Sequence, residues 1–295
     1  MKIKDSGSRK IFLVFVHVVL ALTALACVAP VIHTFAASFS DPVALTSSRS
    51  MLLWPVGTPT LKGYEIVLSN KSIWTGYANT LYYVVAGTAV GIFATILAAY
   101  VFSRKYFLPG NLCMLIISFT MLFNGGLIPN YILMTKLELI NTRMVLILPM
   151  AINVFNLIVL RTAFQAIPES LEEAARLDGA GDMYFLFRIV VPLSKATISV
   201  IILFIAVFNW NSWFASSIYQ NKRNLYPLQI VLREILLQGN ASLTGVTSDI
   251  ASTYSLYNTL TQYCTIVVSI VPILCVYPFL QKHFAKGVMI GAIKG

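Results

Sequence analysis

The sequence predicts an all-α integral membrane protein with six transmembrane helices. Hydrophobic residues make up 58% of the 295-residue chain and charged residues only 11%, whereas soluble domains carry about 25% charged residues. The mean hydropathy of +0.79 indicates the same class. Six apolar runs approach the roughly 20 residues that a helix needs to cross the hydrocarbon core. Strands of a membrane barrel would be about ten residues long with alternating polarity, so we predict helices.

The first predicted span covers residues 11–35 and follows a basic segment, residues 1–10. Basic residues before an apolar run are also typical of a signal peptide, and Ala24-Leu25-Ala26-Cys27 faintly resembles a lipoprotein cleavage site. The apolar run is, however, longer than the roughly 7–15 residues of a signal core. We therefore expect an uncleaved first helix.

Five further apolar runs follow, and none has Lys, Arg, Asp or Glu in its central part. They cover residues 79–102, 112–134, 144–163, 198–217 and 263–280. The third span contains Asn124, Gly125, Gly126 and Pro129, which predict a helix break or a close helix crossing rather than a binding site. Together with the first span, these runs define a six-helix domain over residues 11–282.

The distribution of basic residues predicts the orientation in the membrane. Six crossings place both termini on one side, which holds thirteen of the 21 Lys and Arg residues, whereas the longer loops of the other side hold eight. We therefore place residues 1–10, residues 283–295 and the loop at residues 166–192 in the cytoplasm. Because basic residues at the ends of apolar runs account for the net charge of +10, we expect no nucleic-acid partner.

The loop at residues 166–192 concentrates acidic side chains. Pro168 suits the first position of a helix, and Gly179 suits the left-handed residue that ends one. Glu172 and Arg176 have the spacing of an ion pair one helical turn apart. Of the eleven acidic residues in the chain, five lie in this loop: Glu169, Glu172, Glu173, Asp178 and Asp182.

A second short helix is predicted over residues 183–191, with Asp182 as its N-cap and Pro192 ending it. Two short helices at an angle suit either a protein partner or the lipid headgroups. A helix on the headgroups normally has a polar face rich in Lys and Arg, and anionic lipid would repel the acidic first helix. A protein partner is therefore favoured.

The loop resembles the EAA loop of permease subunits of binding-protein-dependent ABC importers. That pattern is EAA, three residues, glycine, nine residues and I-x-L-P, with Val191 here in place of the usual leucine. The segments at residues 54–64 and 79–81 resemble carbohydrate permeases related to the smaller membrane subunit of the maltose importer. The ending at residues 286–295 is similar to the LplC/YtcP branch of that family. The loop matches the pattern at Glu173, Ala174, Ala175, Gly179, Ile189 and Pro192.

The resemblance implies the type I ABC importer permease fold in a bacterial cytoplasmic membrane, with both termini cytoplasmic. It implies a second, homologous permease in a heterodimer, two ATPase subunits that bind ATP and Mg, an extracytoplasmic sugar-binding protein and an oligosaccharide substrate. In relatives the C-terminal tail reaches the ATPase dimer interface. The residues that the resemblance assigns to ATPase docking are Glu172, Glu173, Ala174, Ala175, Asp178 and Gly179.

The chain lacks the motifs of an enzyme or of a self-powered transporter. It has no G-x-x-x-x-G-K-[ST] phosphate loop, so ATP would bind to partner subunits. Its three His and four Cys residues lack the spacing of a metal site or of a catalytic cluster, so we expect no metal or cofactor on this chain. Two alternatives remain: an ABC permease for a non-sugar solute, and an ion-coupled secondary transporter. The second is disfavoured because no acidic residue lies within a predicted span.

The substrate path is predicted near the end of the fifth span. Sugars bind through amide hydrogen bonds and aromatic stacking, and residues of both kinds occur together there. The alternative is structural, because Asn side chains join membrane helices and Trp side chains anchor at interfaces. The candidate residues are Asn209, Trp210, Asn211 and Trp213.

Overall fold

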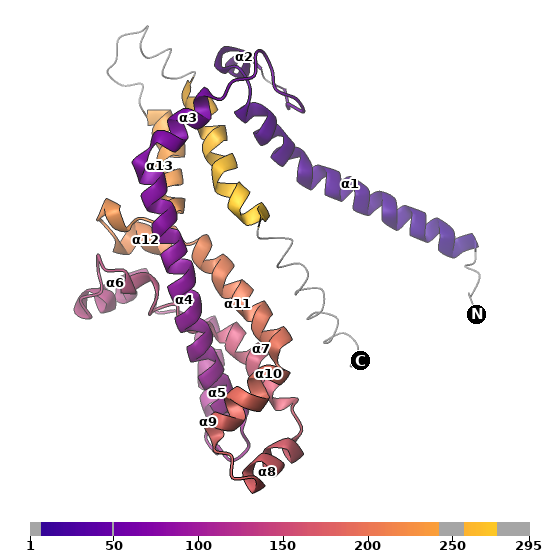
Figure 1. Cartoon of the computed structure of the whole chain (residues 1–295), viewed down its shortest axis with the longest axis vertical. Helices are drawn as coiled ribbons and strands as arrows, with labels where there is room; N and C mark the ends of the chain where they lie inside the picture. Colours follow the sequence, from indigo (N-terminus) through magenta and orange to yellow (C-terminus); the bar gives the residue numbers. More distant parts are fainter. Residues whose placement is uncertain (1–6, 49, 242–256, 276–295) are drawn as a thin grey trace. The chain divides into compact units, whose positions relative to one another are not determined.

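The computed structural model describes residues 7–48, 50–241 and 257–275, and these residues form helices joined by loops without a strand (Figure 1). The chain divides into two compact units. The first comprises Met1–Asn70 and Leu232–Pro272, and the second comprises Lys71–Val231 and Ile273–Gly295. The loop at residues 166–192 and the candidate path residues all belong to the second unit.

The first unit contains a long apolar helix, α1 (Gly7–Ser38), as predicted for the first span. Two short helices follow, α2 (Pro42–Ser47) and α3 (Lys62–Ser69). The Asp41 carboxylate caps α2 by accepting the Val43 and Ala44 N–H groups at 2.9 and 3.2 Å. The last described helix, at residues 257–275, packs beside the end of α1, where the Cys264 thiol donates to the Ser38 carbonyl at 3.3 Å.

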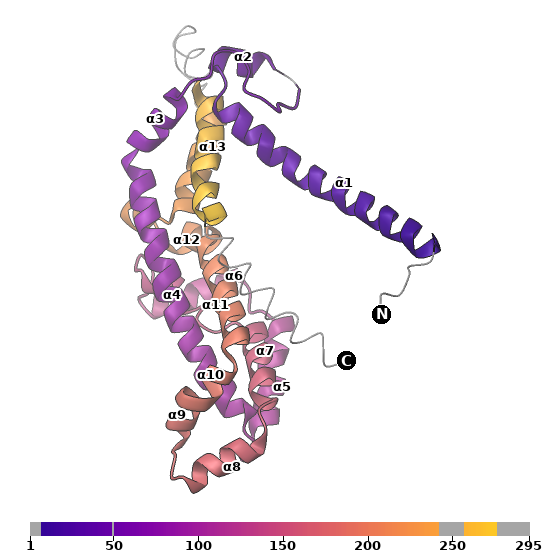
Figure 2. The same cartoon turned by 45° about the vertical axis from the view of Figure 1, so that its right-hand side comes forward.

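The second unit is built around α4 (Lys71–Ser103), which packs against α7 (Val154–Gln165) and α11 (Lys195–Trp210) (Figure 2). Its core contains Ala99, Leu160, Phe164 and Ile201, which are at most 1% exposed. Gly87 allows the close approach of α11, because a Cβ atom there would lie 2.7 Å from the Asn209 amide nitrogen. Because α4 covers residues 79–102 without a break, the second predicted span is confirmed as one continuous helix.

The N-terminal part of α4 holds the segment between η3 (Arg223–Leu225) and α13 (Leu228–Ala241). The Asn79 amide donates to the carbonyls of Asn224 and Tyr226 at 2.8 and 3.1 Å, and the Thr80 hydroxyl accepts the Leu228 N–H at 2.8 Å. These contacts give a structural role to the Asn79-Thr80-Leu81 signature.

A buried polar network continues from the same region. The Gln220 side chain, 1% exposed, donates to the Tyr83 hydroxyl at 3.0 Å and accepts a hydrogen bond from Ser216. Tyr83 in turn donates to the Leu225 carbonyl at 2.9 Å. Because the amide satisfies two hydroxyl groups at once, the network fixes this segment on α4.

The third predicted span is interrupted, and whether it crosses the membrane stays a prediction. Two helices occupy it, α5 (Gly110–Leu122) and α6 (Leu127–Lys136), with an angle of 116° between them. The break lies at residues 123–126, where Gly126 has φ +87° and the Asn124 side chain accepts the Gly126 N–H at 2.9 Å. The predicted helix break at the Asn-Gly-Gly sequence is confirmed.

The fourth and fifth predicted spans are also interrupted. In the fourth, only α7 is α-helical, preceded by the 3-10 helix η1 (Met144–Leu146). The Asn153 side chain sets the start of α7 by accepting the Asn156 N–H at 3.2 Å. In the fifth, α11 ends at Trp210 and α12 (Phe214–Tyr219) begins after a short break.

The described residues contain three helices long and apolar enough to cross a membrane, or up to five if each bent pair of helices is one span. The three are Arg9–Ser38, Lys71–Ser103 and Tyr257–Cys275. The count of six therefore remains a prediction, as do the domain boundaries. The predicted tail at residues 283–295 and the end of the sixth span lie outside the described residues.

Candidate functional site

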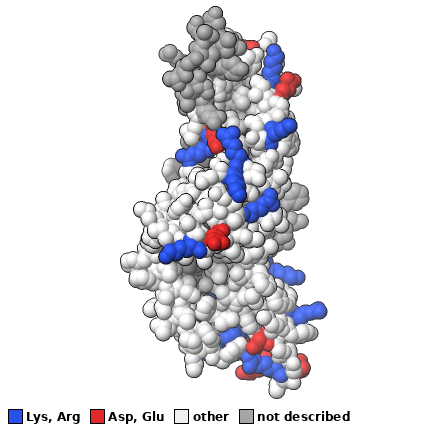
Figure 3. Space-filling model, turned by 90° about the vertical axis from the view of Figure 1, so that its left-hand side faces the viewer, with Lys and Arg blue, Asp and Glu red and all other residues white. Residues whose placement is uncertain are grey.

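The first helix of the candidate loop is α8 (Glu169–Leu177), at the lower end of the second unit in Figure 1. Pro168 has ψ 136° and lies one residue before the helix rather than at its first position. The predicted ion pair within α8 is present, with the Arg176 guanidinium 3.0 Å from Glu172 Oε1. In Figure 3 acidic and basic side chains gather at this end of the molecule.

Gly179 ends α8 as predicted. Its φ of +79° is a left-handed conformation that glycine adopts at little cost. The Gly179 N–H donates to the Arg176 carbonyl at 3.0 Å, and the Ala180 N–H donates to the Ala175 carbonyl at 2.9 Å. This pair of bonds is the Schellman motif, which satisfies carbonyls that the helix end leaves open.

The second helix of the loop differs from the prediction at both ends. It runs through α9 (Asp182–Phe185), the π-helix η2 (Leu186–Val190) and α10 (Val191–Leu193), then bends by 86° into α11. The N-cap is Gly181 rather than the predicted Asp182. The Asp182 carboxylate accepts hydrogen bonds from the Tyr106 and Arg176 side chains and does not cap the helix. Pro192 lies within the helix rather than ending it, since the wider π turn before it suits a residue that has no N–H to donate.

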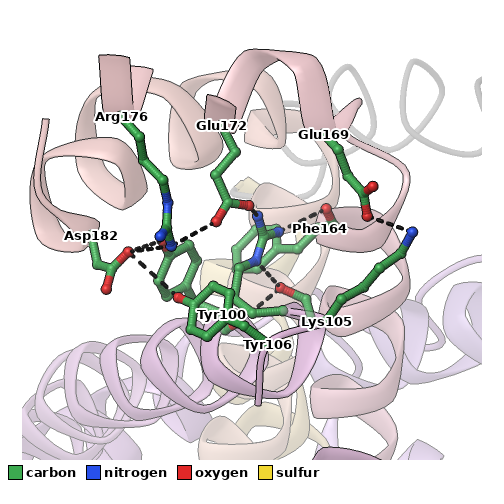
Figure 4. Close-up of polar contacts among 10 residues, drawn as sticks. Tyr100, Lys105, Tyr106, Phe164, Glu169, Glu172, Arg176 and Asp182 are labelled. Atoms are coloured by element: carbon green, nitrogen blue, oxygen red, sulfur yellow. Dashed lines mark hydrogen bonds and ion pairs between the residues drawn. The ribbon is translucent and has the colours of Figure 1, made fainter. Parts of the chain in front are cut away.

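A buried ion pair joins α8 to the end of α4. Arg104 Nη1 lies 2.5 Å from Glu172 Oε2, and the two side chains are 7% and 15% exposed. The guanidinium also donates to the Phe164 carbonyl at 3.2 Å and lies 5.0 Å from the centre of the Tyr100 ring. Figure 4 shows the Glu172, Phe164 and Tyr100 side chains close together around this contact.

Two arginines join the ends of α4 and α7, and each donates a hydrogen bond to a backbone carbonyl of the other helix. Arg104, directly after α4, donates to the Phe164 carbonyl near the end of α7. Arg161 of α7 donates to the Phe102 carbonyl near the end of α4 at 2.8 Å. Positive charge at a helix C-terminus is favourable, so each arginine stabilises the end of the other helix.

A third group of contacts joins α8 to α9. The Arg176 guanidinium lies 3.3 Å from Asp182 Oδ1 and 4.9 Å from the centre of the Tyr106 ring. The hydroxyl groups of Tyr100 and Tyr106 donate to the same carboxylate oxygen at 3.5 and 3.4 Å. Partial burial, with the negative charges of Asp182 and Glu172, raises the pKa of the Tyr106 hydroxyl.

Four of the six predicted docking residues lie on α8, and Asp178 and Gly179 lie directly after it. Ala175 is buried in the core of the second unit, at 7% exposure, and Glu172 pairs with Arg104. The other four are exposed, and they are Glu173, Ala174, Asp178 and Gly179. Two of the six therefore contact the chain's own helices and four form an accessible edge. The docking role itself remains a prediction.

The four predicted path residues have different surroundings within this chain, and their role in a substrate path stays a prediction. Asn209 is buried at the crossing of α11 with Gly87 of α4. The Asn211 amide donates to the Val207 carbonyl at 2.8 Å, which caps the end of α11. These two amides therefore have helix-packing and helix-capping positions, as the structural alternative predicted.

The two tryptophans differ in their surroundings. The indole N–H of Trp210 is buried without a hydrogen-bond partner in the described part of the chain. Trp213 is 38% exposed and meets Phe214 edge to face at 5.5 Å between ring centres. Trp210 is therefore the path candidate with an unused donor.

Sequence reasoning missed the roles of Arg104, Arg161 and Tyr106. The two arginines were used only to assign orientation, because each lies near the end of an apolar run. The sequence signal that could have indicated these roles is the concentration of acidic residues in the loop, because acidic side chains near the membrane surface favour basic partners. Which basic residue faces which acid depends on the packing of α4 against α7, and spacing along the chain does not give it.

Comparison with known proteins identifies the family. A family model described as the binding-protein-dependent transport system inner membrane component matches residues 99–290, about two thirds of the chain. The chain belongs to this family of transport permeases. The family predicted from the EAA-like loop is therefore confirmed, and this permease is a membrane protein.

Two curated relatives from Bacillus subtilis (strain 168) match most of this permease. The polygalacturonan/rhamnogalacturonan transport system permease protein YtcP is 39% identical over 286 residues, covering 97% of this chain and 99% of the relative. Protein LplC is also 39% identical, over 266 residues, covering 90% of this chain and 89% of the relative. These matches confirm the predicted branch of the family.

A solved structure confirms the fold of this permease. It is the crystal structure of a bacterial ABC transporter involved in the import of the acidic polysaccharide alginate, with 33% sequence identity and a TM-score of 0.85. The match covers 96% of this chain and all of the matched chain. The permease therefore has the predicted type I ABC importer fold.

Proposed function

We propose that the permease forms half of a translocation path for an oligosaccharide, delivered by an extracytoplasmic binding protein and driven by two separate ATPase subunits. The observation that carries this proposal is the identity of 39% across 97% of the chain with a permease named for polygalacturonan and rhamnogalacturonan. The crystal structure with a TM-score of 0.85 belongs to a transporter named for alginate. Acidic oligosaccharides are therefore the first substrates to test.

A second, homologous permease would complete the path. In this arrangement both termini and α8 lie in the cytoplasm, as the basic residues favour. ATP and Mg would bind to the ATPase subunits, because the chain has no phosphate-binding loop.

The exposed edge of α8 is the proposed ATPase contact. Glu173 and Ala174 of α8, with Asp178 and Gly179 directly after it, are exposed, while Ala175 on the opposite face packs into the core of the second unit. Small residues on the edge would permit close approach of a groove on the partner, and the two carboxylates would meet basic groups in it.

Uptake by the complete system tests the substrate class. The permease would be expressed with its second permease, ATPase and binding protein, and reconstituted into lipid vesicles. We expect oligogalacturonate, rhamnogalacturonan fragments or oligoalginate to be imported and to stimulate ATP hydrolysis. Import of only neutral oligosaccharides would reject the acidic substrates, and import of no saccharide would favour the non-sugar alternative.

A charge reversal tests docking. Glu173→Lys should abolish the stimulation of ATP hydrolysis by loaded binding protein while membrane insertion persists, because the exposed carboxylate becomes a cation facing the partner. Glu65→Lys, at an exposed position in the first turn of α3, is the matched control. Normal stimulation in the Glu173 variant would reject the assignment of α8.

A further inference from the structure

We propose that Arg104 is a positioning residue that fixes α8 to the paired ends of α4 and α7, so that α8 moves with these helices. The proposal rests on the function proposed above and assigns Glu172 to this internal anchor rather than to the ATPase contact. The buried Arg104–Glu172 pair, together with the hydrogen bond from Arg104 to Phe164, carries the proposal.

The geometry of Arg104 suits a junction between three helices. Its guanidinium donates in three directions: to Glu172 of α8, to the Phe164 carbonyl of α7 and, through Nε, to the Ser103 hydroxyl of α4 at 3.0 Å. A planar guanidinium presents several donors in a fixed arrangement, which a lysine ammonium on a flexible stem does not. One side chain therefore sets the position of α8 relative to both membrane helices.

Burial distinguishes this contact from the ion pair beside it. Lys105 also pairs with an acidic residue of α8, Glu169, but those side chains are 84% and 58% exposed. Exposed pairs contribute little to stability, whereas removing one partner of a buried pair leaves an uncompensated charge. Arg104 and Lys105 thus form a matched pair of neighbouring positions, of which only Arg104 is expected to matter.

The contacts of α8 on its other side complete the anchor. Arg176 bridges Glu172 and Asp182, which connects α8 to the helix that continues into α11. The Ala175 side chain packs into the core cluster of the second unit. The inner face of α8 is therefore attached at its polar and apolar positions, and a tilt of α4 against α7 would be transmitted to its exposed edge.

Hydrogen exchange of the α8 backbone amides tests the anchor directly. The fully assembled transporter would be compared with Arg104→Met, Glu172→Gln and the control Lys105→Met. We expect exchange in α8 to accelerate by about tenfold or more in the first two variants and to stay within about threefold in the control. Unchanged protection in the Arg104 and Glu172 variants would overturn the proposal.

The transport yield, measured as substrate imported per ATP hydrolysed, tests the consequence. We expect it to fall about tenfold in each single variant and no further in the double variant, because both substitutions break one contact. Independent, multiplying losses, or a normal yield in the single variants, would overturn the proposal. Folding defects lower the amount of assembled complex but do not change the yield per ATP of the complexes that assemble.

Two further variants distinguish failure of the anchor proposal from failure of folding and from failure of the docking proposal. If Arg104→Met does not assemble, Arg104→Lys keeps the buried charge but loses the simultaneous bonds to Glu172 and Phe164, and the same accelerated exchange is expected. Glu173→Lys separates the two proposals. A loss of stimulation in that variant with normal behaviour of the Arg104 and Glu172 variants rejects the anchor alone, whereas normal stimulation rejects docking by α8.

Discussion

The turn between α8 and α9 contains two glycines that differ in backbone conformation but have equal space around them. Substitutions at the two positions therefore distinguish the effect of conformation from the effect of steric crowding. Gly179 has φ +79° and Gly181 has φ −76°. A Cβ atom at either position would have no heavy atom within 4 Å. Substitution at Gly179 therefore costs energy through its left-handed conformation, about 1–2 kcal/mol for a residue with a side chain. At Gly181 the conformation is ordinary, and serine is favoured at an N-cap.

A cost of one to two kcal/mol lowers the ratio of ordered to disordered turn about 5- to 30-fold. We expect Gly179→Val to reduce the ATP hydrolysis that loaded binding protein stimulates in reconstituted vesicles. Gly181→Ser should retain wild-type stimulation. Gly179→Asn should be intermediate, because asparagine tolerates the left-handed conformation better than other residues with side chains.

The Gly179→Asn variant distinguishes two explanations for the glycine at this position. If the ATPase approaches the Gly179 backbone so closely that no side chain fits, Gly179→Asn would be as defective as Gly179→Val. If conformation is the reason, asparagine restores part of the activity. Wild-type stimulation in Gly179→Val would refute both explanations, and with them the importance of the Schellman motif for coupling.

Three further outcomes follow from the fold. A cysteine introduced near Asn240 should react with an impermeant thiol reagent from outside, and one at Gly181 only after permeabilisation; the reverse pattern would overturn the orientation. Gln220→Leu should lower the thermal unfolding midpoint in detergent, because it removes the acceptor of the buried Ser216 hydroxyl and one donor to the Tyr83 hydroxyl, at a cost of about 1–3 kcal/mol; an unchanged midpoint would contradict this. Gly87→Leu should reduce the yield of folded protein, measured by monodispersity, since α11 leaves no room for its side chain.

The sequence predicted the class, the family and the helical loop because those features depend on local composition and spacing. Uninterrupted apolar residues predicted α1 and α4, and the Asn-Gly-Gly sequence predicted the break before α6. The shortening of the fourth span was not predicted, although Asn153 is a favourable N-cap. Its apolar neighbours gave the same hydropathy signal whether they formed one long helix or a short helix with an irregular approach.

Only the local features of the candidate site could be predicted from the sequence. The EAA-like pattern identified α8, its ion pair and the role of Gly179, all of which depend on residues within a few positions of one another. Arg104 lies 68 positions before Glu172, and no local rule pairs them. The contact of Asn209 with Gly87 likewise joins two helices far apart in the sequence, and no local rule predicts it.

The arrangement of contacts along α4 connects the two ends of the second unit. This helix has 33 residues, which corresponds to a length of about 50 Å, and it contains no break. Near its start Asn79 and Thr80 hold the segment before α13, and directly after its end Arg104 holds α8. The neighbouring path through α5 and α6 bends by 116°, so it is less suited to carry displacement along the molecule. We therefore expect α4, rather than the broken spans, to link movement at its N-terminal end to the position of α8.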